Sequence, residues 1–273
     1  MSPSQSSTSL SSYDETETLG LINDIYEVLI RQGAFTEKDI IRAPPQGHAI
    51  NLSLLDNPDR IDARVVSLMR KLSEGPEACI APSMKPVYYL SSDDLVWSRD
   101  IDRREMGMDE EAPHDQTNAL PTVLLLLSGR ESTDPALVLD VAHNTIRYFT
   151  EMYNGPHYMD FPAEHAPTYL RRMRDNFRQA KWVANHDGAV LRSDHQYPCN
   201  PADGCWQWTL ELQRTLLEDY KWPGDEFRRE DWIRDAPPMI DSLMQEEYQV
   251  WAGDCTAASA MPVLRDHGLP TTA

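Results

Sequence analysis

The chain has 273 residues and a formal net charge of −19, and 41% of its residues are hydrophobic and 25% charged. This size and composition suit a globular protein with a proper core, whereas the large negative charge repels nucleic-acid phosphate and anionic membrane surfaces. We therefore expect no nucleic acid and no membrane among its partners.

Residues 1–18 are rich in Ser and Thr and contain almost no large apolar side chains. Such a segment cannot offset the entropy lost on ordering, so we expect a disordered tail, and deletion of residues 2–17 should leave the stability unchanged. The segment has neither the apolar run of a signal peptide nor the arginines of a transit peptide. Four cysteines in the chain do not make a disulfide framework. We therefore expect a cytoplasmic protein, or one shared between cytoplasm and nucleus.

Two helices are predicted next. Apolar residues recur at helical spacing over residues 19–30, and Gly33 stands where a helix C-terminus belongs. The stretch RIDARVVSLMRKL repeats this pattern, with Asp56 and Asp59 as candidate N-caps.

The middle of the chain predicts a small sheet. PVYYL predicts a short strand, and LPTVLLLLS predicts a strand buried on both faces, because its apolar run has no polar alternation. ALVLDVAHNTIRYF predicts a hairpin with His143 and Asn144 in its turn, since Asn tolerates the left-handed backbone that such turns need.

The last third predicts helices again. One begins near Pro167, a second has Asp203 as its candidate N-cap, and a third has Asp235 as N-cap with prolines in its first turn. Residues 253–273 have the pattern of a frayed tail.

Segregated strands and helices favour an α+β fold over a doubly wound α/β fold. We expect a small, mainly antiparallel sheet over about residues 85–150, packed by N- and C-terminal helices. A single domain is expected to cover residues 19–252.

The segment HYMDFPAEH brings His157, Asp160 and His165 within nine residues. Two imidazoles and a carboxylate are the donors of one known type of metal site. A glycine and two prolines interrupt this part of the chain, so it offers the three donors no rigid scaffold. We therefore expect no bound metal at these residues, and instead half-exposed histidines or a cap for the helix that follows.

Other polar motifs identify no catalytic residue, and the sequence predicts no cofactor. It contains neither of the familiar glycine-rich phosphate loops. The aspartates at positions 93, 94, 100 and 102 lack the spacing of a magnesium-diphosphate site, and acids at a helix start complement its dipole. Cys199 and Cys205 are spaced more widely than most zinc ligands, although His186 and His195 are near in sequence.

Two surface features bear on partners. The arginines at positions 171, 172, 174 and 178 share a predicted helix; we expect them to pair with the protein's own carboxylates or remain solvated, and an acidic partner is the alternative. Five of the seven tryptophans lie at positions 206, 208, 222, 232 and 251. Because exposed Trp anchors interfaces, we expect a protein partner, if there is one, to bind this aromatic-rich C-terminal third.

Several stretches together resemble a large group of uncharacterised proteins of filamentous fungi, over roughly residues 19–252. They are LINDIYEVLI, APPQGHAIN, RVVSLMRKL, DDLVWSRD with RREMG, LVLDVAHNTIRYF and APTYLRRMRDNFRQAKWV. PTVLLLLSGRESTDPALVLDVAHNTIRYF, followed by PTYLRRMRDNF, is similar to the strands and helix of the SUKH superfamily, with Asp140 at the matching place. The first resemblance implies no activity, and the second implies a binding scaffold.

These observations favour a non-enzymatic intracellular interaction or regulatory protein. They rest on the missing catalytic motifs, the acidic composition and the clustered aromatic residues. The alternative is an enzyme or accessory factor in small-molecule metabolism, such as a fungal specialised pathway, with its site in the loops around residues 157–165. A deep pocket with convergent polar groups would favour the enzyme, and an exposed aromatic patch would favour the interaction protein.

Overall fold

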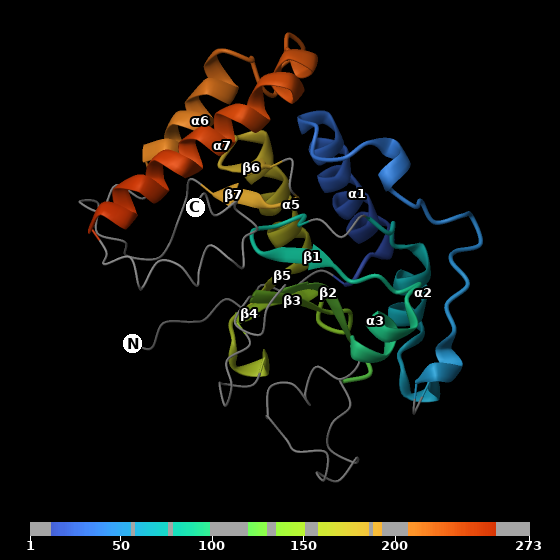
Figure 1. Cartoon of the computed structure of the whole chain (residues 1–273). Coiled ribbons are helices and arrows are strands. Elements are labelled where there is room, and N and C mark those ends of the chain that lie inside the picture. The colour runs from blue at the N-terminus through green and yellow to red at the C-terminus, as the bar shows by residue number, and fades with distance from the viewer. Residues whose placement is uncertain are drawn as a thin grey trace, which may run out of the picture. The chain divides into compact units, whose positions relative to one another are not determined.

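The computed structural model of the chain describes residues 12–55, 58–75, 79–98, 120–129, 135–150, 158–185, 188–192 and 207–254. Its α-helices are α1 (Glu15–Gln32), α2 (Ala63–Lys71), α3 (Ser92–Trp97), α5 (Ala166–Arg178), α6 (Gln207–Glu218) and α7 (Arg229–Asp254). Its strands are β1 (Met84–Pro86), β2 (Val123–Gly129), β3 (Pro135–Asp140), β4 (Thr145–Thr150), β5 (Ala163–His165), β6 (Trp182–Ala184) and β7 (Val190–Arg192) (Figure 1).

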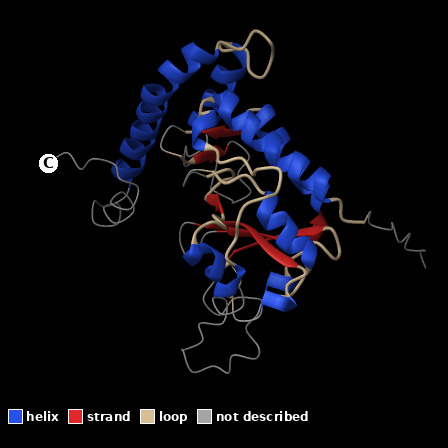
Figure 2. Ribbon diagram, turned by 90° about the vertical axis from the view of Figure 1, so that its right-hand side faces the viewer, coloured by secondary structure: helices blue, strands red, loops and turns tan. Residues whose placement is uncertain are grey.

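The first five strands form an antiparallel sheet in the order β1-β2-β3-β4-β5, so each strand pairs with its neighbour along the chain. β6 and β7 form a two-stranded sheet (Figure 2, strands in red). The three inner strands of the larger sheet come from residues 123–150, as the apolar runs predict. The α+β fold class is therefore confirmed.

The hairpin between β3 and β4 is also confirmed. All six residues of β3 pair with residues of β4, from Pro135 opposite Thr150 to Asp140 opposite Thr145. The turn occupies residues 141–144, and Asn144 has the predicted left-handed backbone with a φ of 53°. The adjacent strand β2 is buried on both faces over residues 123–128, which explains its unbroken apolar run.

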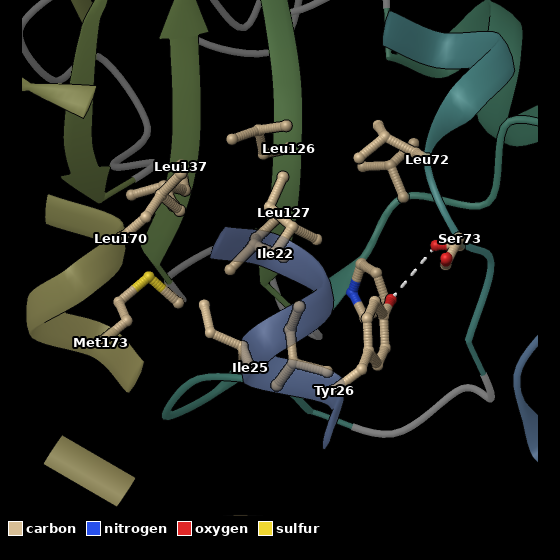
Figure 3. Close-up of a pocket in the computed structure, with 13 residues that line it drawn as sticks. Ile22, Ile25, Tyr26, Leu72, Ser73, Leu126, Leu127, Leu137, Leu170 and Met173 are labelled. Carbon is tan, nitrogen blue, oxygen red and sulfur yellow. Dashed lines mark hydrogen bonds between the residues drawn. The ribbon is translucent and has the colours of Figure 1, made fainter. Parts of the chain in front are cut away.

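One face of the larger sheet packs against α1 and α5. Ile25 of α1 and Leu170 and Met173 of α5 meet Leu127 of β2 and Leu137 of β3 (Figure 3). All five side chains are buried, and complete burial of one such side chain contributes about 1.5–3 kcal/mol. Of the two helices that cover this face, α1 precedes the five strands in the chain and α5 follows them.

The first helix begins inside the segment that the sequence predicts as tail. Asp14 accepts a hydrogen bond from the N–H of Glu17 at 3.1 Å, so α1 starts at Glu15, and Thr18 is buried. Gly33 ends the helix with a φ of 90°, as predicted. The helix therefore starts before the first apolar residue of its predicted pattern, because an N-cap hydrogen bond does not require apolar side chains. Residues 1–11 lie outside the described residues.

Capping also differs from the prediction at α2. Asp62 caps this helix by accepting the N–H of Arg64 at 2.8 Å. Asp59 lies instead in a short 3-10 helix, Pro58–Arg60, and Asp56 is outside the described residues. A capping side chain must reach the backbone N–H of the second or third residue of the helix. Asp62 directly precedes the helix and can do so, which is why it is the cap.

The long helix α7 begins at Arg229, which corrects the prediction of a start after Asp235. Pro237 and Pro238 therefore lie inside the helix, where each removes one backbone hydrogen bond. Asp235 does not cap the helix; it accepts a hydrogen bond from the hydroxyl of Tyr220 at 3.0 Å. Among the described helices, none is both long and apolar enough to cross a membrane.

The strand predicted at PVYYL lies earlier, at Met84–Pro86. The N–H of Val87 still bonds to the carbonyl of Leu126 in β2. The next amide, of Tyr88, donates to the carboxylate of Asp94 at 3.2 Å, and this bond turns the chain into α3. The Tyr88 amide thus bonds to the Asp94 side chain instead of to a carbonyl of β2, and β1 ends before this residue.

The chain divides into two compact units, residues 1–190 and residues 191–273, and each is described by itself. The domain boundaries expected from the sequence stay a prediction, because a division by contacts does not test whether each unit folds alone. The expected C-terminal tail over residues 253–273 lies almost entirely outside the described residues.

Candidate functional site

Polar side chains gather at the end of the larger sheet where β3 turns into β4. The register places Asp140 opposite Thr145, and Thr145 opposite His165, so three neighbouring strands contribute to one row. We call Arg64, Asp140, His143, Asn144 and His165 the turn cluster. Its residues come from α2, from the hairpin and from the junction of β5 with α5.

Asp140 is the buried acid of the turn cluster, with 2% of its surface exposed. It accepts hydrogen bonds from the N–H of Ala142 at 2.9 Å and from Nδ1 of His143 at 2.6 Å. Burial raises the pKa of this carboxyl, but the hydrogen bonds from His143, Ala142 and Thr122 outweigh burial and hold the pKa below its usual value. Asp140 is therefore ionised at neutral pH and closes the turn through the amide two residues on.

Asn144 joins the hairpin turn to α5 and to the N-terminal segment. Its carbonyl accepts the N–H of Ala166 at 2.9 Å, and its side-chain amide donates to Nε2 of His165 at 3.3 Å and to the carbonyl of Ser12 at 3.4 Å. Because Nε2 of His165 accepts this bond, its Nδ1 carries the proton and donates to the hydroxyl of Thr168 at 3.1 Å. His165 therefore links the turn to the first turn of α5.

Arg64 and Tyr13 complete this end of the sheet. Arg64 donates to the carbonyl of Val141 at 3.2 Å and pairs with Asp62 at 2.7 Å. Burial raises the pKa of Tyr13, and the neighbouring charge of Glu15 raises it further. The segment before α1 thus lies against the protein, which the apolar pattern of the sequence does not predict.

Of the three candidate metal residues, at which the sequence predicts no bound metal, the structure describes Asp160 and His165. Asp160 is exposed in a 3-10 helix, Tyr158–Asp160, and both ring nitrogens of His165 have hydrogen-bond partners. His157 lies outside the described residues. Within those residues, no group of three or more His, Cys, Asp or Glu side chains is arranged to hold a metal ion.

Of the other candidate residues named from the sequence, only some lie in the described part of the chain. Asp93 and Asp94 lie in the first turn of α3, where they complement the helix dipole as expected. The remaining candidates, Asp100, Asp102, His186, His195, Cys199 and Cys205, lie outside the described residues.

The basic residues of α5 pair within the protein. Arg171 pairs with Glu17 and Arg172 with Glu164. Arg174 pairs with Asp24 and with Asp175, at 3.0 Å each. The expectation of self-pairing is thus confirmed for three of the four arginines.

A small apolar cavity lies between α1, α5 and the sheet (Figure 3). Its volume is about 30 Å³, enough for about two water-sized spheres. Sites for small-molecule ligands usually measure about 300–1,000 Å³. Tyr26 and Ser73 provide most of its polar edge, where the Tyr26 hydroxyl donates to the carbonyl of Ser73 at 3.4 Å. None of the turn cluster lines this cavity.

Glu74 follows directly after the cavity wall and is 1% exposed. Burial raises its pKa to about 8; a hydrogen bond from the N–H of Tyr89 opposes this shift, and the charge of Asp94 adds to it. Its Oε1 atom has no hydrogen-bond partner. Glu74 is one of two acids in the stretch LSEGPEAC, whose Gly and Pro are typical of a surface loop, so sequence reasoning misses this group.

Unit 191–273 contains an aromatic cluster in the connection between α6 and α7. The rings of Trp222 and Phe227 meet edge-on with centroids 4.9 Å apart, and those of Tyr220 and Trp232 with centroids 5.2 Å apart. Trp222 and Trp232 are buried, so these two tryptophans are core residues of the helix pair. The side chains of Trp206, Trp208 and Trp251 lie outside the described residues.

Comparison with known proteins gives no relative: no family model matches the chain, and neither a curated protein nor a solved structure matches it significantly. The resemblances to a fungal protein group and to the SUKH superfamily stay predictions. The chemistry of the described residues therefore carries the functional argument.

Proposed function

We propose that this chain is a non-enzymatic interaction or regulatory protein that binds a positively charged protein surface. The contact is proposed to lie at the connection between α6 and α7, defined as residues 218–228. This places the partner on the aromatic-rich C-terminal third, with acids rather than buried tryptophans as the contacting groups.

The main observation that supports this proposal is the set of exposed acids on the connection. Glu218, Asp219, Asp225 and Glu226 are all exposed, and the connection also carries two exposed cations, Lys221 and Arg228. The aromatic cluster, in which Trp222 and Trp232 are buried, holds the connection in place. Acids on a fixed support lose little side-chain entropy on binding, which favours a complementary cationic partner.

The charge distribution supports the same proposal. The chain has 44 acidic and 25 basic side chains. The basic face of α5 is largely neutralised by Glu17, Glu164 and Asp24. Near the connection, Arg228 pairs with Asp231 and Arg229 with Glu230. The field presented to a partner is therefore negative, and such a field accelerates association with basic proteins.

The test is affinity capture from source cells, with protein identification by mass spectrometry at low and high salt. The fourfold variant Glu218→Gln, Asp219→Asn, Asp225→Asn, Glu226→Gln removes the proposed contact. A control variant, Asp59→Asn, Asp93→Asn, Asp160→Asn, Glu211→Gln, removes the same charge from exposed positions elsewhere. We expect wild type and control to enrich the same basic protein and the fourfold variant to lose it. Equal enrichment by all three proteins, or none by wild type, would contradict the proposal.

The pair of Asp140 and His143 favours the alternative, an enzyme. A buried carboxylate that orients an exposed imidazole is half of a general-base arrangement. Screening with chromogenic ester and phosphate substrates, on wild type and on His143→Ala, tests this alternative. Turnover that disappears in His143→Ala would place the enzyme ahead of the interaction protein.

A further inference from the structure

The extended segment Leu72–Gly75 forms one wall of the apolar cavity. The side chains of Leu72 and Ser73 line the cavity, and the ring of Tyr26 lies so close to Gly75 that an added Cβ there would meet it at 3.0 Å. The carbonyl of Leu72 accepts a hydrogen bond from Nε2 of His48 at 3.1 Å. Every displacement of this segment therefore changes the cavity wall.

Within the described part of the chain, one isolated backbone bridge holds the segment against Ile41. Glu74 and Ile41 exchange two hydrogen bonds, of 2.7 and 3.0 Å, while the Ile41 side chain is exposed. On its inner side, the hydroxyl of Ser73 donates to the side chain of Asn23 at 2.9 Å. Ile41 is exposed to solvent, whereas Asn23 and His48 are not.

The groups around the Glu74 side chain favour its neutral form. Asp94 of α3 repels a negative charge at this position, and the N–H of Tyr89 donates the one bond that favours the charged form. Tyr26 of α1 is also buried, and burial raises its pKa, so its phenol stays neutral and neither repels nor balances a charge on Glu74.

The arginine beside the bridge residue Ile41 is paired with other acids. Arg42, which follows Ile41, pairs with Glu27 of α1 and with Glu37. A buried carboxylate without a paired cation is costly, because its charge loses hydration and the single hydrogen bond from Tyr89 compensates for only part of that loss.

We propose that Glu74 is a proton-operated latch: its neutral side chain keeps segment 72–75 closed, and loss of its proton releases the segment and opens the apolar cavity. The proton passes to a base in the solvent, and no other bond forms or breaks covalently. The released carboxylate reaches water by breaking the bridge to Ile41, since Ile41 is the partner that is exposed to solvent. Burial places the pKa of Glu74 at about 8, so release occurs under mildly alkaline conditions.

The latch is tested with the full chain and an apolar fluorescent dye, 8-anilinonaphthalene sulfonate, from about pH 6 to pH 10. Wild type is expected to show a several-fold rise in dye fluorescence centred near pH 8, while circular dichroism keeps its folded signal. Glu74→Gln, which cannot ionise, is expected to stay dark over the whole range. Glu211→Gln, which removes an exposed acid outside the proposed contact, should follow wild type.

Amide exchange locates the opening. In wild type, the protection of the Ile41 and Glu74 amides is expected to fall above pH 8, and in Glu74→Gln it should persist. The proposal is overturned if wild type binds no dye on alkalinisation, if Glu74→Gln binds dye as wild type does, or if the dye signal coincides with loss of the folded circular-dichroism signal.

Discussion

Replacing Glu74 by Gln isolates the energetic effect of one buried acid. The unfolded chain releases the proton of this carboxyl near its ordinary pKa of 4.5, whereas the folded chain keeps it up to about pH 8. Between these values the folded state binds more protons than the unfolded state, so the stability of wild type falls as pH rises. Below pH 4.5 and above pH 8 this contribution is constant.

The magnitude follows from that window. Each pH unit changes the free energy of unfolding by about 1.4 kcal/mol. The cost of keeping Glu74 buried thus reaches about 3 kcal/mol at pH 7 and about 5 kcal/mol above pH 8. Glu74→Gln is isosteric and neutral, so it removes the pH-dependent part of this cost.

Urea denaturation at pH 5, 7 and 9 measures the effect. The free energy of unfolding of Glu74→Gln minus that of wild type should rise by about 2–3 kcal/mol from pH 5 to pH 7 and continue to rise to pH 9. Glu211→Gln, at an exposed position, should show no such trend. A constant difference between Glu74→Gln and wild type across the three pH values would refute the reasoning, because the carboxyl would then ionise normally in the folded state.

Three further predictions follow from the fold. Leu125→Asp should abolish folding, seen as loss of the cooperative thermal transition, because Leu125 is buried in an inner strand and an unpaired charge there costs several kcal/mol. Deletion of residues 2–11 should leave the melting temperature unchanged. Deletion of residues 2–14 should lower the melting temperature by several degrees, because it removes the Asp14 cap, worth about 1 kcal/mol, and the contacts of Ser12 and Tyr13. Equal melting temperatures of the two deletions would refute this prediction. Asp140→Asn should destabilise the protein at pH 7, and less so as the pH falls through the pKa of Asp140, because the stabilisation from a lowered pKa is lost on protonation. Urea denaturation measures this effect. A loss in free energy of unfolding that does not change with pH would contradict the lowered pKa of Asp140.

The sequence predicts those elements whose signal is local and repeated. The apolar run of β2 and the Asn in the hairpin turn specify burial and backbone geometry directly, and both predictions are confirmed. The helix ends are less predictable, since Asp14 and Asp62 compete with neighbouring polar residues for the capping position. A cap is decided by one hydrogen bond of about 1 kcal/mol, which periodicity does not register.

The candidate sites depend on contacts between residues far apart in the chain. Asn144 reaches His165 across 21 positions, and Ser12 across 132. Glu74 is buried because segments around Ile41 and Asp94 close over it, and no local pattern distinguishes it from a surface glutamate. Tertiary packing therefore determines which polar residues matter, while the sequence supplies their types.

The proposed function is tested most directly by calorimetric titration of the captured basic protein against three proteins: wild type, the fourfold variant at residues 218, 219, 225 and 226, and the control variant at residues 59, 93, 160 and 211. We predict that the fourfold variant binds at least about tenfold more weakly than the control, a loss of about 1.4 kcal/mol, and that its Kd depends less steeply on salt. Equal Kd values for the fourfold and control variants would contradict the proposed contact, since the total negative charge would then decide binding rather than the α6–α7 connection.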